Sequence, residues 1–316
     1  MTTVHEDPEI ITPLIVEEVT GGSEPGGLVG LFKSMPLTIK IASIWLTIAL
    51  LAAAGAWIVE IFNTKLPGLT DPNYNHFIFE GKPANQGPSG EFWLGTDKLA
   101  RDNFSRLVYG TRVSVTVAMT AVAFGVVFGG FLGSLVGMVR GFTETSVMAI
   151  IDVILGFPPL ILLLVMVSIF ETRSLMIISV VIGLLSIAPY TRVARANALS
   201  AANREYVMAA RAIGAKPLRI LFREIIPNVL PALVAYAFVA AAVIMVVEGS
   251  LAFLGLSVQP PDPTWGAMIF EARGDMRQNI WPLVYPSVTM VLTVLSLNIV
   301  GDWLFARNAA RSAALG

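Results

Sequence analysis

The chain has 316 residues, of which 55% are hydrophobic and only 14% are charged, and its mean hydropathy is +0.73. A water-soluble domain carries about 25% charged residues, so this composition predicts an integral membrane protein. The chain has no cysteine, which excludes disulfides and a cysteine nucleophile. The two histidines, His5 and His76, lie far apart in polar segments. We expect them to be solvated side chains and expect no metal site.

The first 30 residues are acidic and contain proline and glycine. They lack the basic start and the apolar run of a signal peptide, so we expect residues 1–38 to form a mobile cytoplasmic tail. Residues 27–34 have a spacing similar to that of a phosphate-binding loop, but Phe32 stands where the second glycine is required. No ATP-binding motif is therefore expected in this chain.

Six apolar stretches are long enough to cross a bilayer as helices, which takes about 20 residues each. They are residues 39–62, 113–139, 147–170, 175–193, 230–256 and 283–305. The fourth is the shortest and contains Pro189. The sequence thus predicts an all-α integral membrane protein with six transmembrane helices and both chain ends on one side.

Lysine and arginine indicate which side that is, because cytoplasmic loops are richer in them. With both ends in the cytoplasm, twelve of these residues lie inside and nine lie outside. Six of the nine lie in the long segment 63–112, and long segments carry little weight. We therefore expect an N-in/C-in topology, with 63–112 outside the cytoplasm and 306–316 as a cytoplasmic tail.

Segment 63–112 has two parts of different character. Its first half is rich in proline, asparagine and glycine and is typical of a loop. Its second half, residues 93–112, predicts an amphipathic helix whose apolar face carries Leu99, Phe104, Leu107 and Val108. Such a helix either caps the bundle at the membrane interface or offers a docking surface for a binding protein.

The second predicted span carries glycines four residues apart, at Gly125, Gly129, Gly133 and Gly137. This spacing places them on one face of a helix, where small residues let two backbones approach closely in lipid. We expect a tight helix-packing seam there, and a seam that slides when a pore changes state is the alternative.

Two carboxylates fall within predicted spans, and an intramembrane carboxylate usually faces a cavity or a partner. Asp152 lies near the inner end of the third span and Glu248 in the outer half of the fifth. Together with Ser250 and Phe253, they are candidates for a translocation path or gate. Two simpler roles stay open, which are a hydrogen bond from Glu248 to a neighbouring helix and a hydrated Asp152.

The stretch 203–231 is polar, basic and helix-prone between two apolar runs. Gly214 can end one helix and Pro217 can begin another, so the sequence predicts two short helices joined by a tight bend on the cytoplasmic side. Ala209-Ala210, Gly214 and Pro227-Asn228 resemble the EAA loop of ABC importer permeases. Met208 stands where that family has its glutamate.

Three further motifs resemble the dipeptide/oligopeptide (and nickel) permease branch, C-type subunit. The first comprises Leu94-Gly95-Thr96-Asp97, Arg101-Asp102, Ser105-Arg106-Leu107 and Gly110, with Ala100 in place of a glycine. The second comprises Glu248, Ser250-Leu251, Phe253-Leu254-Gly255-Leu256, Pro260-Pro261, Pro263 and Trp265-Gly266, with Ser257 in place of a glycine. The third comprises Asn298, Gly301-Asp302 and Leu304.

The resemblance implies a type I ABC importer permease fold, with a core at 113–305 and a coupling loop at 200–229. It implies a non-catalytic bacterial cell-membrane subunit that forms half of a pore for di- and oligopeptides. Its expected partners are a second homologous permease, two ATPase subunits that bind ATP and Mg²⁺, and an extracytoplasmic binding protein. The residues expected to contact the ATPase are Glu205, Ala209, Ala210, Arg211, Gly214, Ala215, Lys216, Pro217 and Arg219.

Other functions stay open from the sequence. A permease for nickel or another small solute belongs to the same family. An ion-coupled secondary transporter would use Glu248 or Asp152 as its coupling acid, although no internal repeat is evident. An intramembrane enzyme is disfavoured, because the spans contain neither a metal-ligand motif nor a Ser/His pair.

Overall fold

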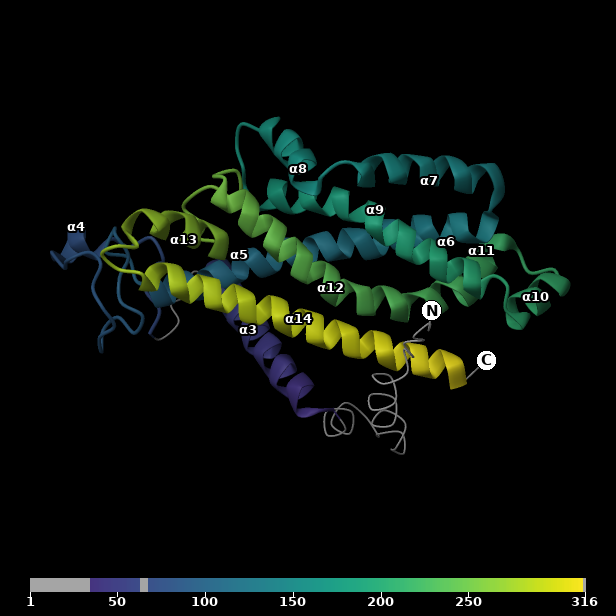
Figure 1. Ribbon diagram of the computed structural model, residues 1–316, viewed down its shortest axis with the longest axis horizontal. Helices are drawn as coiled ribbons and strands as arrows, with labels where there is room; N and C mark the ends of the chain where they lie inside the picture. Colours follow the sequence, from purple (N-terminus) through teal and green to yellow (C-terminus); the bar gives the residue numbers. More distant parts are fainter. Residues whose placement is uncertain (1–34, 63–67, 315–316) are drawn as a thin grey trace, which may run out of the picture.

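A computed structural model describes residues 35–62 and 68–314. His5, the stretch 27–34 and most of the predicted tail 1–38 lie outside these residues. The described residues form helices and turns with no strand (Figure 1), and Thr96 and Asp102 form one isolated bridge. The all-α architecture predicted from the sequence is confirmed.

Three long helical stretches and several short helices make up the first two thirds of the fold. In chain order, the elements are α3 (Leu37–Phe62), α4 (His76–Glu80), α5 (Asn103–Phe124), the π-helical turn η1 (Gly125–Gly129), α6 (Gly130–Val139), α7 (Gly141–Gly156), α8 (Pro159–Ser168) and α9 (Leu175–Ala201). The remaining elements are α10 (Glu205–Ala212), α11 (Pro217–Ile220), the π-helical turn η2 (Leu221–Ile225), α12 (Ile226–Phe253), α13 (Trp265–Ala272), the 3₁₀ turn η3 (Arg273–Asp275) and α14 (Trp281–Ala314).

Five helical stretches of the described chain are long and apolar enough to cross a membrane. They are Leu37–Phe62, Asn103–Val139, Leu175–Ala201, Pro217–Phe253 and Trp281–Ala310. The predicted third span is instead the pair α7 and α8, bent by 89°. Phe157 takes an extended backbone before Pro158, because a residue that precedes proline is disfavoured in a helix. The expectation of six spans therefore holds only if this broken pair counts as one.

The bundle has two ends of different composition (Figure 1). We call the end with α4 and α13 the α13 end, and the end with α10, α11 and the end of α14 the α10 end. Residues 93–102 form turns, and the helix begins only at Asn103, continuing directly into the span. The separate amphipathic helix predicted over 93–112 is therefore wrong, because Asp102 caps α5 by accepting from the backbone N–H groups of Phe104 and Ser105.

The end of α14 and the burial of His76 also differ from the predictions. α14 extends to Ala314 and therefore includes most of the expected tail 306–316. His76, expected in solvent, is only 4% exposed and lies between the rings of Tyr74 and Phe92. A single histidine between aromatic rings carries no periodic signal, which is why the sequence did not indicate its burial.

α9 is the helix around which the bundle is built, because half of its span is buried. The glycine face of α5, η1 and α6 packs directly against it. A Cβ atom added at Gly129, Gly133 or Gly137 would lie 2.6, 2.3 or 2.8 Å from a backbone oxygen of α9. A side chain at any of these positions would force the two backbones apart, so glycine is required for this contact.

Candidate coupling and translocation sites

The chain between α9 and α12 folds into two short helices, which we call the elbow (residues 203–220). Gly214 connects them with φ of +79°, a left-handed conformation that glycine adopts without a side-chain penalty. Pro217 then begins α11 at its first turn, where its missing N–H costs nothing. The structure thus contains the bent pair of helices predicted from Gly214 and Pro217.

Few side chains anchor the elbow to the bundle. Val207 is the buried residue of α10 and Ile220 that of α11, and both join a cluster with Tyr190 and Ala194 of α9. In the described part of the chain, no salt bridge involves residues 204–219. The elbow is therefore attached at its inner face and open on its outer face.

The outer face of the elbow carries large apolar side chains. Ile213 is 81% exposed, Leu218 is 64% exposed and Met208 is 53% exposed. Most of the residues expected to contact an ATPase are exposed beside them, namely Glu205, Ala209, Arg211, Gly214, Lys216, Pro217 and Arg219, whereas Ala210 and Ala215 are half-buried. A cluster of exposed apolar side chains is typical of a protein–protein contact surface.

Glu248, a candidate for the translocation path, is buried inside the subunit and is 2% exposed. The Ser257 hydroxyl donates to its Oε1 over 2.7 Å, and the hydroxyls of Thr264 and Ser114 also bond to the carboxyl group. These partners come from the α12–α13 connection, the residue before α13, and α5. In this conformation Glu248 ties three elements together, which agrees with the alternative of a bond to neighbouring helices. Its role in a translocation path stays a prediction.

Of the other three path candidates, Ser250 and Phe253 follow Glu248 on α12, and Asp152 lies on α7. The Ser250 hydroxyl donates to the Val246 carbonyl of its own helix over 2.8 Å. Phe253 is 46% exposed and packs edge-on against Phe270 of α13. Asp152 is exposed and pairs with Arg192 of α9. The four predicted residues therefore have different partners, and no bond joins them among the contacts described here.

The pair of Asp152 and Arg192 belongs to a polar row that holds α7 against α9. Glu144 of α7 pairs with Arg195 of α9. Arg140, next to α7, donates to the Asn203 side chain over 2.8 Å. α7 buries little of its own surface, with Ile151 as its one buried residue, so these polar contacts fix its position.

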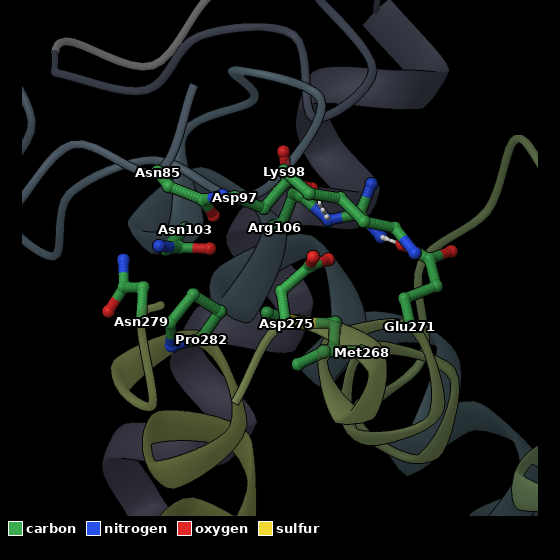
Figure 2. Close-up of a pocket in the computed structure, with 11 residues that line it drawn as sticks. Asn85, Asp97, Lys98, Asn103, Arg106, Met268, Glu271, Asp275, Asn279 and Pro282 are labelled. Carbon is green, nitrogen blue, oxygen red and sulfur yellow. Dashed lines mark hydrogen bonds and ion pairs between the residues drawn. The ribbon is translucent and has the colours of Figure 1, made fainter. Parts of the chain in front are cut away.

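A dense group of ion pairs, which the sequence did not predict, lies at the α13 end. Arg101 pairs with Asp97 over 2.6 Å and also with Glu271 of α13, and Arg106 of α5 reaches Glu271 over 3.0 Å. Figure 2 shows Arg106 and Glu271 pointing toward each other beside a small pocket that both line. Its volume of about 20 Å³ has room for about one water. Glu271 lies 170 residues from Arg101 and 165 from Arg106, so no local pattern could reveal these two pairs.

A second cluster of polar and aromatic groups covers the same end. Asn75 caps α4 by accepting from the backbone N–H of Ile78, and Glu80 of α4 bonds to Lys82 and His76. These two bonds lower the pKa of the Glu80 carboxyl from 4.5 to about 2, and Lys82 has the larger effect. Glu80 therefore stays ionised over the physiological pH range.

An apolar cavity of about 190 Å³ lies between α7, α8, α9 and α12. Pro189 and Tyr190 of α9 line it together with Tyr236 of α12. The Tyr190 hydroxyl is buried and has no hydrogen-bond partner in the described structure. Because Pro189 has no N–H, the Leu185 carbonyl also lacks its usual helical donor. The cavity is therefore mainly apolar, and the unpaired hydroxyl belongs to one of the residues that line it.

The sequence that forms these sites matches a family of transport proteins. The family described as "Binding-protein-dependent transport system inner membrane component" matches residues 125–313. The chain belongs to this family. The match includes the elbow, the whole of α9 and α12 and the cavity between them. The permease is thus a non-catalytic, multi-pass protein of the bacterial cell membrane that works with a binding protein, an ATPase and a second permease.

Named relatives and a solved structure agree with this assignment. The glutathione transport system permease protein GsiD of Pectobacterium atrosepticum is 37% identical over 230 residues, covering 73% of this chain and 75% of the relative. GsiD of Shigella sonnei is 35% identical over 247 residues, covering 78% and 80%. A chain of the MetNI methionine ABC transporter, solved in inward facing conformations, is similar with a TM-score of 0.50 and 20% identity, covering 64% of this chain and 96% of that chain. The permease fold is therefore shown.

Proposed function

We propose that this permease forms half of the translocation pore of an ATP-driven importer of di- and oligopeptides. The observation that carries the proposal is the elbow, whose exposed Ile213 and Leu218 lie at one end of a bundle of membrane spans. The importer comprises this chain, a second homologous permease, two ATPase subunits and an extracytoplasmic binding protein. ATP and Mg²⁺ are bound by the ATPase subunits.

The elbow is connected to the spans in a way that suits a lever. α9 ends at Ala201, just before the elbow, and α12 follows it through the turn η2. A movement of the elbow therefore acts on both helices, which together form most of the wall of the 190 Å³ cavity. Such coupling requires that the ATPase binds two positions of the elbow with different affinity.

The cargo is inferred from the relatives and from the expected topology. The two GsiD relatives carry the name of a glutathione transport system, and glutathione is a tripeptide, so they favour a peptide over nickel as the cargo. The basic residues of the sequence favour the cytoplasm for the elbow. The α13 end then faces the outside, where a binding protein delivers its cargo.

The test replaces an exposed apolar side chain of the elbow by a charge. We expect Leu218→Asp to remove copurification of the ATPase subunits and to abolish peptide-stimulated ATP hydrolysis, because a carboxylate cannot enter an apolar protein contact without a large desolvation cost. Ile78→Asp makes the same change at a 70% exposed residue of α4 and keeps the ATPase bound. Normal ATPase binding by Leu218→Asp would contradict the proposed role of the elbow.

A further inference from the structure

A third cavity, larger than the other two, opens at the α13 end. It has a volume of about 470 Å³, within the range of about 300 to 1,000 Å³ that is typical of small-molecule sites. The α12–α13 connection and α13 line most of it, and the turn before α9, the start of α5 and the loop before α5 line the rest. Its charged lining residues are Arg101, Arg106, Arg173, Asp262 and Glu271. Three cations against two carboxylates leave this lining with one excess positive charge.

All but one of these charged groups already have a partner. Arg101 and Arg106 share Glu271, and Asp262 pairs over 2.6 Å with Arg112, which stands outside the lining. Arg173 has no ion pair among the residues that the structure describes, and its Nε atom is buried without a hydrogen-bond partner. The excess positive charge of the cavity is therefore located on Arg173.

The backbone holds Arg173 in place beside the cavity. The Gln259 N–H donates to the Arg173 carbonyl over 3.0 Å, and the Arg173 N–H donates to the Gln259 side-chain oxygen over 3.5 Å. Gln259 and Asn73 add neutral polar groups to the lining, and Phe270 adds an aromatic ring. The cavity thus combines one unpaired guanidinium, two amides and an apolar surface.

We propose that Arg173 binds the terminal carboxylate of the peptide cargo at the outer mouth of the permease, an inference that rests on the proposed function. A guanidinium binds a carboxylate through two parallel N–H···O bonds, and burial strengthens such bonds relative to water. The amides of Gln259 and Asn73 offer partners for peptide groups, and Phe270 offers a surface for an apolar side chain. Because Arg173 lines a hollow, a small carboxylate fits it better than the flat surface of a binding protein.

The experiment compares two peptides that differ only at their carboxyl end. Uptake of radiolabelled trialanine and of trialanine amide is measured in membrane vesicles that contain the complete importer. For Arg173→Gln we expect about tenfold slower uptake of trialanine and unchanged uptake of the amide, since a hydrogen bond to a charged group changes affinity by about one order of magnitude. Arg173→Lys keeps part of the preference for trialanine.

Arg277→Gln is the matched control, because Arg277 is an exposed cation in the α13–α14 connection, and we expect it to leave both rates unchanged. An equal loss for both peptides in Arg173→Gln, at a normal level of protein in the membrane, would overturn the proposal in favour of a contact with the binding protein. Unchanged rates for both peptides would also overturn it. If the unaltered importer takes up neither peptide, the proposed function itself fails, and this inference fails with it.

Discussion

The two ends of the bundle are held together by different forces. At the α13 end, Arg101 and Arg106 share Glu271, and Arg112 pairs with Asp262, so charges from distant parts of the chain close that end. At the α10 end, the elbow is anchored by Val207 and Ile220 and leaves apolar side chains exposed. The comparison shows that long-range ion pairs fix the α13 end, whereas a few buried apolar side chains attach the elbow.

The largest effect is expected where α6 packs against α9 through its glycines. Gly133→Ala places a Cβ 2.3 Å from the Thr191 carbonyl oxygen of α9, and overpacking of this kind costs about 1 to 3 kcal/mol. Gly156→Ala is the control, because nothing lies within 4 Å of its added Cβ. Thermal unfolding in detergent should show a lower Tm for the first variant only. Equal Tm values for the two variants would contradict the close packing of α6 against α9.

The ion pairs of the α13 end are expected to contribute to stability more than the charges of the elbow. Glu271→Ala leaves Arg106, whose side chain is 3% exposed, without its nearest carboxylate. We expect a loss of about 2 kcal/mol, less than for a fully buried pair because the Glu271 side chain is 28% exposed. Glu205→Ala removes an exposed carboxylate of the elbow and should leave the Tm unchanged. A similar loss of stability in both variants would contradict the proposed difference between the two ends.

The elbow should respond to backbone strain in transport and not in stability. Gly214→Val forces a β-branched residue into the left-handed region, which costs about 1 to 2 kcal/mol, whereas Gly214→Asn tolerates it. Because nothing packs within 4 Å of a Cβ there, the bundle stays folded. We expect about tenfold slower ATP-driven uptake for the valine variant and nearly normal uptake for the asparagine variant. Normal uptake by both variants would show that the backbone bend at Gly214 is not needed for ATP-driven transport.

The smallest effect concerns the same backbone conformation at the α13 end. Ala100 is buried and has φ of +52°, a left-handed conformation that glycine adopts more easily. Ala100→Gly should therefore raise the free energy of unfolding by about 1 kcal/mol, since relief of left-handed strain exceeds the entropy that glycine loses on folding. A lower Tm in thermal unfolding would show that the packing of the alanine methyl group stabilises the protein by more than the backbone strain destabilises it.

Local patterns in the sequence predicted the parts of the fold that depend on local chemistry. Apolar length identified the straight spans, the glycine spacing indicated a close helix face, and Gly214 with Pro217 indicated the elbow. Each of these signals acts within a few turns of one helix. Pro158 carried a similar local signal, but an apolar run that continues past it disguised the 89° bend between α7 and α8.

The features that the sequence did not predict depend on how the chain folds back on itself. Glu271 meets Arg101 and Arg106 across more than 160 positions, and the bond from Ser257 to Glu248 forms only because the α12–α13 connection turns back onto the bundle. His76 is buried by rings on both sides of it in sequence. Tertiary packing creates these contacts, so neither periodicity nor spacing could indicate them.

In the proposed function, the elbow is a cytoplasmic contact surface through which the ATPase subunits drive the pore. Because the chain has no cysteine, a single Ile213→Cys change provides a unique label, and Lys98→Cys provides its counterpart on an exposed residue at the α13 end. With a membrane-impermeant maleimide applied to intact cells, we expect labelling at position 98 and none at 213. In inside-out vesicles, position 213 should react, and it should be protected when the ATPase subunits are bound. Labelling of position 213 from outside intact cells would contradict the account.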